Sequence, residues 1–231
     1  MNYRPLDLGF ILVLIPARGG SVRLPGKNLA KVGGRSLVAR AVDTARATAQ
    51  IAEVLVSSDD PAILDEAVRA GAAAEVRPAP LASSSATTRE VVDDLLGRRH
   101  EVDVLVILQP TSPLRVAADV EACLGALDRH DTVTSVTACE YPARWSMLLD
   151  GEGLLTPQAV SWSSALATGT QHEVRPNGAV YAARTKHLRA GGDLVGPGTA
   201  AVEMPRSRSV DIDDALDLHV ARLLEMHPLD E

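Results

Sequence analysis

Short apolar runs alternate along the chain with amphipathic segments. The apolar runs, each of which predicts a β-strand, cover residues 10–17, 53–58, 74–77, 102–109 and 132–138. The segments between them have helical periodicity and predict helices over residues 36–48, 61–70, 87–99 and 116–129. Strands that are apolar on both faces are typical of a parallel sheet covered by helices on both sides. We therefore expect an α/β protein with three layers, α/β/α, and a mostly parallel, Rossmann-like sheet, in a single domain over residues 1–231.

This alternation breaks between residues 140 and 174. The segment holds both tryptophans, Trp145 and Trp162, together with a polar run. It predicts a small excursion from the sheet, either a lid or a dimerisation arm or both, because large exposed apolar groups commonly pack on a partner chain. After it, the pattern predicts a strand over 177–184, a short strand near 201–204 and a final helix from about 213 to 227.

The segment between the first strand and the first helix is rich in glycine and in cations. It covers residues 15–28 and reads IPARGGSVRLPGKN. Two consecutive glycines allow the backbone to come close to a ligand, and Arg18, Arg23 and Lys27 add three positive charges. The glycine spacing of a dinucleotide-binding fingerprint and the Gly-Lys-Ser/Thr of a P-loop are both absent. The segment predicts a phosphate-binding loop, and a solvated basic turn is the alternative.

A second candidate site lies near the end of the chain, in the sequence VDIDDALDL. Asp211 and Asp213 are two residues apart, and in an extended segment such residues project to the same side. Two carboxylates together with the phosphate oxygens of a substrate form a suitable set of ligands for Mg²⁺. Asp213 is also a good N-cap for the final helix. The pattern alone therefore leaves both metal binding and helix capping open.

Composition limits the possible partners and locations. The net charge of −7 and the sequence pI of about 5.4 argue against nucleic acid or an acidic membrane surface as the main partner. Cys123 and Cys139 stand in apolar surroundings, which predicts buried free thiols and not a disulfide or a metal site. The apolar run that ends at Ile15 is too short to span a bilayer and has no signal-peptide layout. We expect a cytoplasmic protein.

Five segments together carry a family resemblance. They read IPARGGSVRLPGKN (15–28), RPAPLASSSATT (77–88), ILQPTSPLR (107–115), RPNGAVY (175–181) and VDIDDALDL (210–218). In their order and spread they resemble the acylneuraminate cytidylyltransferases, which are the CMP-sialic acid synthetases and their relatives. The resemblance implies an enzyme in which the 2-hydroxyl of a nonulosonic-type or related sugar acid attacks the α-phosphorus of CTP. The products would be a CMP-sugar and pyrophosphate. The resemblance also implies Mg²⁺ as the cofactor and a homodimer formed through residues 140–174.

The resemblance also implies a role for each motif residue. The implied nucleotide-binding residues are Ala17, Arg18, Gly19, Ser21, Arg23, Lys27, Asn28, Arg77, Ala86 and Thr88. The implied acceptor-binding residues are Gln109, Arg144, Arg175, Asn177 and Tyr181. Arg18, Arg23, Lys27, Asp211 and Asp213 would be catalytic through positioning and charge neutralisation. The Mg²⁺ ligands would be the two aspartates of this set.

The chain departs from the sialate-type pattern at several positions. Val22 stands where those enzymes have a lysine, although Arg23 follows it, as in the keto-deoxy-octulosonate cytidylyltransferases. Ser84 replaces a common aspartate, and residues 165–170 lack the arginine that sialate-type enzymes use on the sugar carboxylate. Arg144 could take over the acid group, because a guanidinium binds a carboxylate bidentately. We therefore expect a modified sugar acid or another small acid as acceptor, and not N-acetylneuraminate.

Two other functions are compatible with the same residues. A glycosyltransferase would use Asp211 and Asp213 as an Asp-x-Asp metal site, but this reading leaves the cations of the N-terminal loop unexplained. A family member that has lost catalysis is the other possibility, and it is motivated by Val22, Ser84 and the missing arginines. The first would hydrolyse a donor sugar without CTP turnover, and the second would bind CTP without releasing pyrophosphate.

Overall fold

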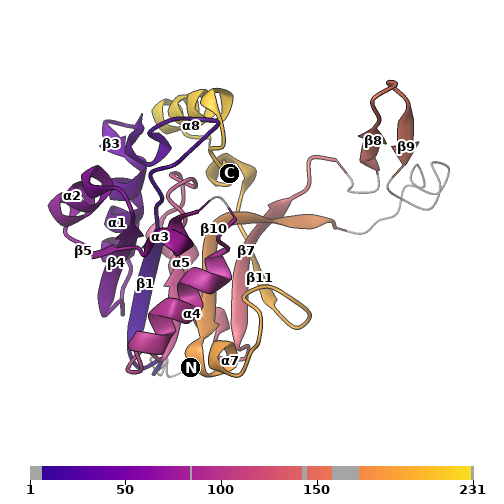
Figure 1. Ribbon diagram of the computed structural model, residues 1–231. Helices are drawn as coiled ribbons and strands as arrows, with labels where there is room; N and C mark the ends of the chain where they lie inside the picture. Colours follow the sequence, from indigo (N-terminus) through magenta and orange to yellow (C-terminus); the bar gives the residue numbers. More distant parts are fainter. Residues whose placement is uncertain (1–6, 84, 142–144, 158–171, 230–231) are drawn as a thin grey trace.

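Seven strands form the central sheet of the computed structural model, in the order β11-β7-β10-β6-β1-β4-β5 (Figure 1). The structure describes residues 7–83, 85–141, 145–157 and 172–229. Paired neighbours in the sheet are parallel except at β10, which runs antiparallel to both β6 and β7. The strands of the sheet are β1 (Ile11–Pro16), β4 (Glu53–Ser58), β5 (Ala73–Val76), β6 (Val104–Ile107), β7 (Thr132–Ala138), β10 (Val174–Arg184) and β11 (Ala200–Glu203).

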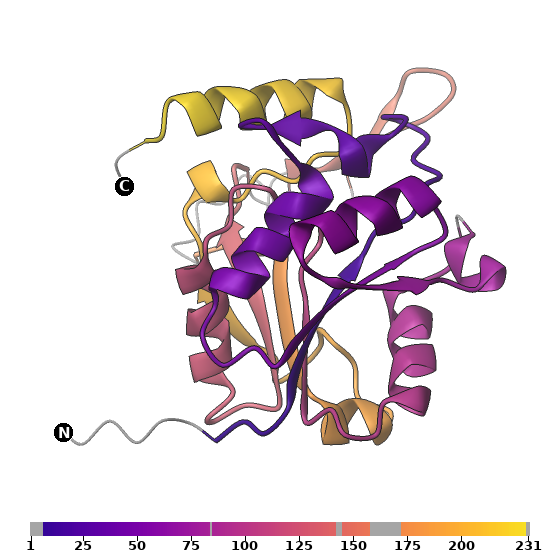
Figure 2. The same ribbon diagram turned by 90° about the vertical axis from the view of Figure 1, so that its left-hand side faces the viewer.

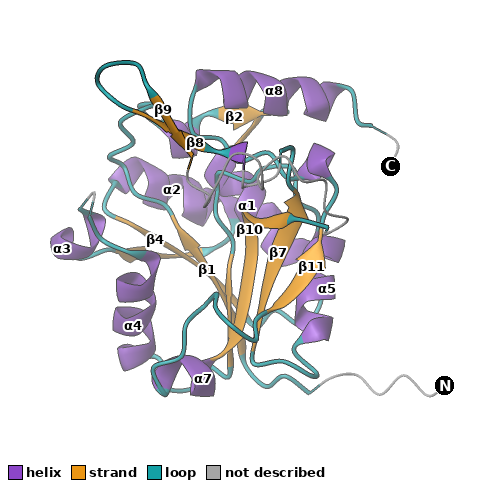
Figure 3. Ribbon diagram, turned by 90° about the vertical axis from the view of Figure 1, so that its right-hand side faces the viewer, coloured by secondary structure: helices purple, strands orange, loops and turns teal. Residues whose placement is uncertain are grey.

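Helices cover both faces of this sheet, because alternate residues of each central strand enter different cores. In β1, Val13 and Ile15 pack with α1, α2 and α5, whereas Leu12 and Leu14 pack with α4. Figure 3 shows α4 and α5 on opposite sides of the strands. The predicted three-layer, mostly parallel α/β fold is confirmed. The helices are α1 (Leu37–Ala47), α2 (Pro61–Ala70), α3 (Ala79–Ala82), α4 (Thr88–Arg98), α5 (Ala117–Ala126), α7 (Thr185–Arg189) and α8 (Ala215–Met226), with 3-10 turns η1 (Lys27–Leu29) and η3 (Arg206–Arg208).

Capping side chains explain where the helices begin. The Ser36 side chain accepts a hydrogen bond from a backbone N–H in the first turn of α1, and Asp60 does the same ahead of Pro61 in α2. Thr87 and Glu90 form a capping box at α4. The predicted final helix starts two residues late, at Ala215, because its N-cap is Asp214 and not the expected Asp213.

Two short hairpins lie outside the central sheet. The first, β2 (Lys31–Val32) with β3 (Arg35–Ser36), lies beneath α8 (Figure 2) and joins it in an apolar cluster that includes Val32, Ile212 and Leu218. The second, β8 (Met147–Leu149) with β9 (Leu155–Pro157), projects away from the body of the protein (Figure 1). It forms the described middle of segment 140–174, and the predicted residues Trp162 and Arg144 lie outside the described residues. No helix within the described ranges is long and apolar enough to cross a bilayer.

Candidate functional site

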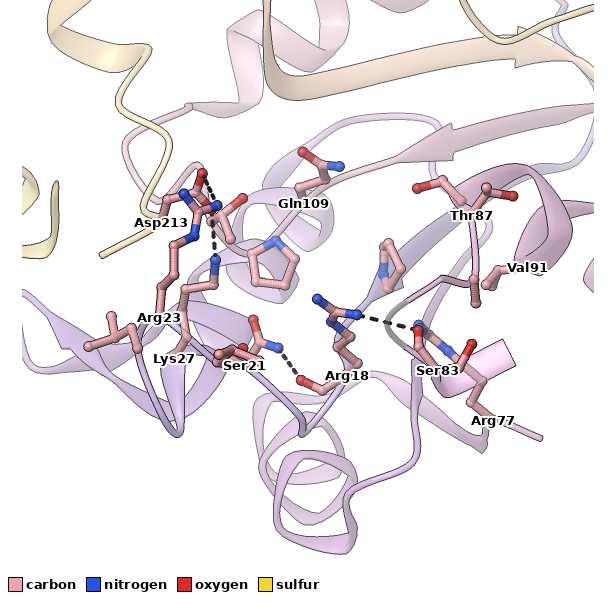
Figure 4. A pocket seen from close by; sticks show the side chains of 18 of the residues that line it. Arg18, Ser21, Arg23, Lys27, Arg77, Ser83, Thr87, Val91, Gln109 and Asp213 are labelled. Atoms are coloured by element: carbon pink, nitrogen blue, oxygen red, sulfur yellow. Dashed lines mark hydrogen bonds and ion pairs between the residues drawn. The ribbon is translucent and has the colours of Figure 1, made fainter. Parts of the chain in front are cut away.

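A cavity of about 400 Å³ opens beyond the carboxyl ends of the parallel strands β1 and β6 (Figure 4). Open α/β sheets bind their ligands at this edge, and the volume is within the range of small-molecule sites. Four segments form its walls: the loop after β1, the stretch leading into α4, the end of β6, and the residues before α8. Of the residues predicted from the sequence, those that line it are Arg18, Ser21, Arg23, Lys27, Asn28, Arg77, Ala86, Thr88, Gln109, Asp211 and Asp213.

Backbone contacts set the shape of the loop after β1. Ala17 is fully buried and its N–H donates to a carbonyl of β4. The Gly19 N–H donates to Asp59 Oδ1 at 2.9 Å, and Asn28 Nδ2 donates to the Arg18 carbonyl at 2.8 Å. Ala17, Gly19 and Asn28 therefore make contacts that support the loop, and Asn28 also lines the cavity.

The long polar side chains of the same loop are presented to the cavity. Arg18 reaches across it, and its Nη1 donates to the Ser83 carbonyl at 3.3 Å on the opposite wall (Figure 4). Ser21, Arg23 and Lys27 line the cavity on the side nearest α8. Val22, in the middle of this segment, is 85% exposed at the rim and adds no charge. One wall thus carries three cations, as an anionic ligand requires.

The two candidate sites of the sequence form one site in the structure. Arg23 Nη2 lies 2.7 Å from Asp213 Oδ2, and Lys27 Nζ lies 3.2 Å from Asp213 Oδ1 (Figure 4). Lys27 Nζ also donates to the Ile212 carbonyl at 2.8 Å. Desolvation raises the pKa of Asp213, but the hydrogen bond and charge of Lys27, with those of Arg23, lower it below its ordinary value overall. Asp213 is therefore a firmly ionised carboxylate.

Asp211 and Asp213 face the same cavity because the residue between them is anchored in the core. Ile212 is fully buried, and its N–H donates to the Thr111 carbonyl at 2.8 Å. The Asp211 side chain is accessible to solvent, yet the protein around it raises the pKa of Asp211 by desolvation; a hydrogen bond from Thr111 opposes this shift, and the charge of Asp213 adds to it. Two like charges that share one site favour a bound cation.

Arg77 lies deeper than the sequence suggested. Its side chain is 7% exposed, and it donates to the Ser57 carbonyl at 2.7 Å and to the Ser57 hydroxyl at 3.2 Å. Burial lowers the pKa of Arg77, and the charge of Asp59 opposes that shift. Arg77 thus ties the wall of the cavity to β4, while Ala86 and Thr88 line the same wall.

The end of β6 meets the RPNG turn at the cavity. Gly178 has φ of +75°, and a Cβ added to it would lie 2.6 Å from Gln109 Oε1 and 3.7 Å from Asp211 Oδ2, so only glycine fits. Asn177 is 1% exposed, and its amide bonds to two buried serine hydroxyls. Gln109 lines the cavity, whereas Asn177 supports the turn from the interior and does not line the cavity.

Two described residues of the predicted acceptor set, Arg175 and Tyr181, do not line the cavity. Arg175 is exposed on β10, paired with Thr137 of β7. Tyr181 packs against the core on the α4 side; burial raises the pKa of Tyr181, and so does the charge of Asp211. Arg144 lies outside the described residues. Among the described members of the predicted acceptor set, Gln109 is the one that lines this cavity.

The sequence-based prediction assigned no role to Thr111 or to Gly178. Thr111 hydrogen-bonds Asp211, and a Cβ added at Gly178 would lie 2.6 Å from Gln109 Oε1. Position in the chain could have identified Thr111, because it follows the carboxyl end of β6 in an α/β sheet.

Comparison with known proteins gives a consistent family. A family model described as cytidylyltransferase matches residues 12–148. The chain is 30% identical over 228 residues to the CMP-N,N'-diacetyllegionaminic acid synthase of Legionella pneumophila, covering 94% of this chain and 97% of that protein. It is 27% identical over 223 residues to a pseudaminic acid cytidylyltransferase of Campylobacter jejuni, covering 92% and 95%. It is 28% identical over 214 residues to the N-acylneuraminate cytidylyltransferase of Escherichia coli, covering 91% of this chain but 51% of that longer protein.

Solved structures show the same fold. The chain matches CMP:2-keto-3-deoxy-manno-octonic acid synthetase complexed with CTP with a TM-score of 0.71 at 19% identity, covering 95% of this chain and all of that one. It matches 4-diphosphocytidyl-2C-methyl-D-erythritol synthase from Anaerococcus prevotii with a TM-score of 0.67 at 14% identity, covering 96% of this chain and all of that one. At these identities the likeness shows the fold and nothing finer.

Proposed function

Because the chain belongs to the cytidylyltransferase family of the CMP-sialic acid synthetases, and is therefore a nucleotidyltransferase, we propose that it transfers CMP from CTP to a nonulosonic-type sugar acid. The observation that carries this proposal is the meeting of Arg23 and Lys27 with Asp213 in one cavity, beside Asp211. Phosphoryl transfer from a nucleoside triphosphate needs cations for the phosphates and carboxylates for a divalent metal in the same place. The reaction belongs in the cytoplasm, where CTP is present.

The triphosphate would lie along the loop after β1. Arg18, Arg23 and Lys27 supply the charge and Ser21 supplies a hydroxyl. The Arg23–Asp213 pair is largely exposed, with side chains 68% and 42% accessible, so it is weak and can exchange for a phosphate contact. The cytosine and ribose would pack on the wall formed by the segment before α4, which Arg77 holds in place.

Asp211 and Asp213 are suited to hold Mg²⁺ together with the phosphates. The described residues contain no group of three or more His, Cys, Asp or Glu side chains that could hold a metal ion. A site of two carboxylates relies on substrate oxygens for its other ligands, and this is the arrangement that Mg²⁺ favours. When bound, Mg²⁺ would neutralise phosphate charge during the transfer. Arg23, whose pair with Asp213 is largely exposed, would then contact the triphosphate, while Lys27 would keep its hydrogen bond to the Ile212 carbonyl.

The chemical step is a displacement at the α-phosphorus. The acceptor hydroxyl oxygen forms a bond to phosphorus and loses its proton, while the bond from phosphorus to the pyrophosphate oxygen breaks. Arg18, Arg23 and Lys27 stabilise the negative charge that gathers on the phosphates, and they act by position, since the loop that bears them is fixed by buried contacts. Gln109, which follows β6 and lines the cavity, would orient the acceptor.

A modified nonulosonic acid is the acceptor class that fits best. The relatives named above act on diacetyllegionaminic, pseudaminic and N-acylneuraminic acids. The chain lacks the arginine that sialate-type enzymes carry within residues 165–170, and its rim carries Val22 in place of a lysine. These differences support an acid other than N-acetylneuraminate.

The function is tested by pyrophosphate release with Mg²⁺, using the four nucleoside triphosphates against a panel of legionaminic, pseudaminic, neuraminic and keto-deoxy-octulosonic acids. We expect turnover with CTP and one modified nonulosonic acid, and at least tenfold less with N-acetylneuraminate, a difference of about 1.4 kcal/mol. Binding of CTP without turnover for any acid would indicate a protein that has lost catalysis. Hydrolysis of a nucleotide-sugar donor without CTP turnover would instead support a glycosyltransferase.

We further propose a homodimer formed through segment 140–174. On the β8–β9 hairpin, Leu149 is 70% and Leu155 is 61% exposed, and the two are cross-strand partners. Light scattering at micromolar concentration should report a dimer, and Leu149→Asp with Leu155→Asp should yield a monomer, because burying two charges opposes association. Leu216→Asp is the matched control, since Leu216 is 69% exposed on α8. A parent protein that is monomeric would contradict the proposal.

A further inference from the structure

The joint between β6 and β10 is held together by polar contacts from within the protein. The pairing of β10 with β7 changes register between Pro176 and Tyr181, so the intervening residues form a bulge. Within this bulge, a Cβ added at Gly178 would lie 2.6 Å from Gln109 Oε1 and 3.7 Å from Asp211 Oδ2, so the bulge lies against both side chains. The junction of β6 and β10 therefore forms the side of the cavity that we assign to the acceptor.

The side chain of Arg115 links β6 and β10 at this joint. Its Nη1 donates to the Gln109 carbonyl at 2.6 Å and to the Ala179 carbonyl at 3.0 Å, so one nitrogen links the end of β6 to the bulge of β10. The Ser112 hydroxyl adds a longer contact to the Asn177 carbonyl at 3.4 Å. Arg115 does not line the 400 Å³ cavity; it lines a separate cavity of about 270 Å³. It has no route to touch a bound substrate directly.

The cost of keeping an arginine here argues for a role beyond stability. Arg115 is 3% exposed, and its Nε and Nη2 have no hydrogen-bond partner among the described residues. Burial lowers the pKa of Arg115 to about 9, the charge of Asp119 opposes that shift, and the charge of Arg40 adds to it. Asp119 is itself hydrogen-bonded to Arg208 at 2.8 Å. A buried, incompletely satisfied charge is commonly less stabilising than an apolar residue of similar size.

We propose that Arg115 is a positioning residue for the acceptor: by linking the carbonyls of Gln109 and Ala179, it sets where the Gln109 side chain and the Gly178 backbone face the cavity. This inference rests on the proposed function, since it assigns Gln109 to the acceptor side. The inference separates the acceptor half of the site, at Gln109 and Gly178, from the nucleotide half, at the loop after β1. Neither carbonyl that Arg115 binds belongs to the loop after β1, so the nucleotide half should not depend on Arg115.

The test is Arg115→Lys, because a lysine keeps the charge but its nitrogen lies one bond short of the position of Nη1, the atom that links the two carbonyls. With CTP and the acid that responds in the panel, kcat/KM for the acid should fall between ~10- and ~100-fold, as expected for displaced positioning groups. The Kd for CTP, measured by calorimetry without acid, should stay within a factor of two. Arg184→Lys is the matched control, since Arg184 Nη2 donates to the Leu127 carbonyl at 2.9 Å at the far end of β10.

A double-mutant cycle with Gln109→Ala distinguishes positioning from general weakening. If Arg115 acts through Gln109, the double variant should lose little more acceptor kcat/KM than Gln109→Ala alone. Additive losses, or CTP binding and acceptor turnover that fall together with the melting temperature, would overturn the proposal. If Arg115→Lys does not fold, Ser112→Ala removes the other contact across the joint and should give the same selective loss in weaker form.

A readout without turnover keeps this inference separate from the proposed function. In ¹⁵N spectra of the protein without acceptor, the side-chain amide of Gln109 should shift in Arg115→Lys and stay in place in Arg184→Lys. If no acid turns over with CTP but the amide still shifts, the proposed function fails while the link from Arg115 to Gln109 stands. An unmoved Gln109 amide in Arg115→Lys would refute the link whatever the activity.

Discussion

Asp211→Asn is expected to remove most Mg²⁺-dependent pyrophosphate release from CTP, with kcat/KM lower by ~10²–10³-fold. The factor corresponds to the several kcal/mol of charge stabilisation that a metal contributes to phosphoryl transfer. Asparagine keeps the shape of the side chain but loses the charge that, with Asp213, would hold the cation. The measurement is a pyrophosphate-coupled rate at saturating acid, with CTP and Mg²⁺ varied separately.

The same variant should fold as well as the parent. Desolvation and the charge of Asp213 already disfavour the ionised form of Asp211, so a neutral side chain should leave the melting temperature equal or higher. Asp128→Asn, an exposed carboxylate after α5 at the opposite end of the sheet, is the matched control and should retain parent activity. Parent-level turnover in Asp211→Asn would contradict the metal assignment.

Lys27→Met is expected to weaken the use of CTP by ~10- to ~150-fold in kcat/KM, equivalent to the loss of one charge-assisted hydrogen bond of ~1.5–3 kcal/mol. The Lys27 side chain is 14% exposed, and its ammonium is held by the Ile212 carbonyl and by Asp213. Such a fixed cation reaches the triphosphate without a large loss of side-chain freedom. Methionine keeps the apolar stem, so the loss should come from the charge.

Lys31→Met provides the comparison for this change. Lys31 lies four residues further along, is exposed on β2, and does not line the cavity. The Lys31→Met substitution removes one positive charge from the same region, so it measures the general effect of charge on kcat/KM for CTP. Equal losses in both variants would mean that Lys27 acts only through long-range charge, and an unchanged Lys27→Met would require another role for the loop.

The central strands were predictable because their sequence pattern has one solution. The apolar run at residues 53–58 becomes β4 with the same bounds, and 132–138 becomes β7. A strand buried on both faces carries few charged residues, and Glu53 at the start of β4 is the one charged residue of these two strands. The helix predicted over 116–129 ends earlier, at Ala126, because helix ends depend on local backbone geometry that periodicity does not encode.

The N-cap of the final helix is Asp214, although the sequence also offered its neighbour Asp213. Asp213 and Asp214 are adjacent and both are good N-caps. The structure uses Asp214, because Asp217 stands three residues beyond it and completes a capping box. That spacing was present in the sequence. With capping assigned to its neighbour, Asp213 is left to contact Arg23 and Lys27.

The joining of the two candidate sites could not be read from the sequence. Lys27 and Asp213 are 186 residues apart along the chain and meet only because α8 packs over the β2–β3 hairpin. Asn177 was predicted to bind the acceptor, but its amide turns into the interior and holds the bulge of β10. Both outcomes depend on tertiary packing, so a motif identified the region while the fold decided the direction of each side chain.

The central claim is that the cavity transfers CMP and does not merely hydrolyse CTP. The most direct test is a mass balance by ³¹P spectroscopy and mass spectrometry on the protein with CTP, Mg²⁺ and the responding acid. We expect one CMP–acid conjugate for each pyrophosphate released, and both products formed ~10²–10³-fold more slowly in Asp211→Asn. Release of pyrophosphate and free CMP without any conjugate, at the same rate with and without the acid, would contradict the claim of CMP transfer.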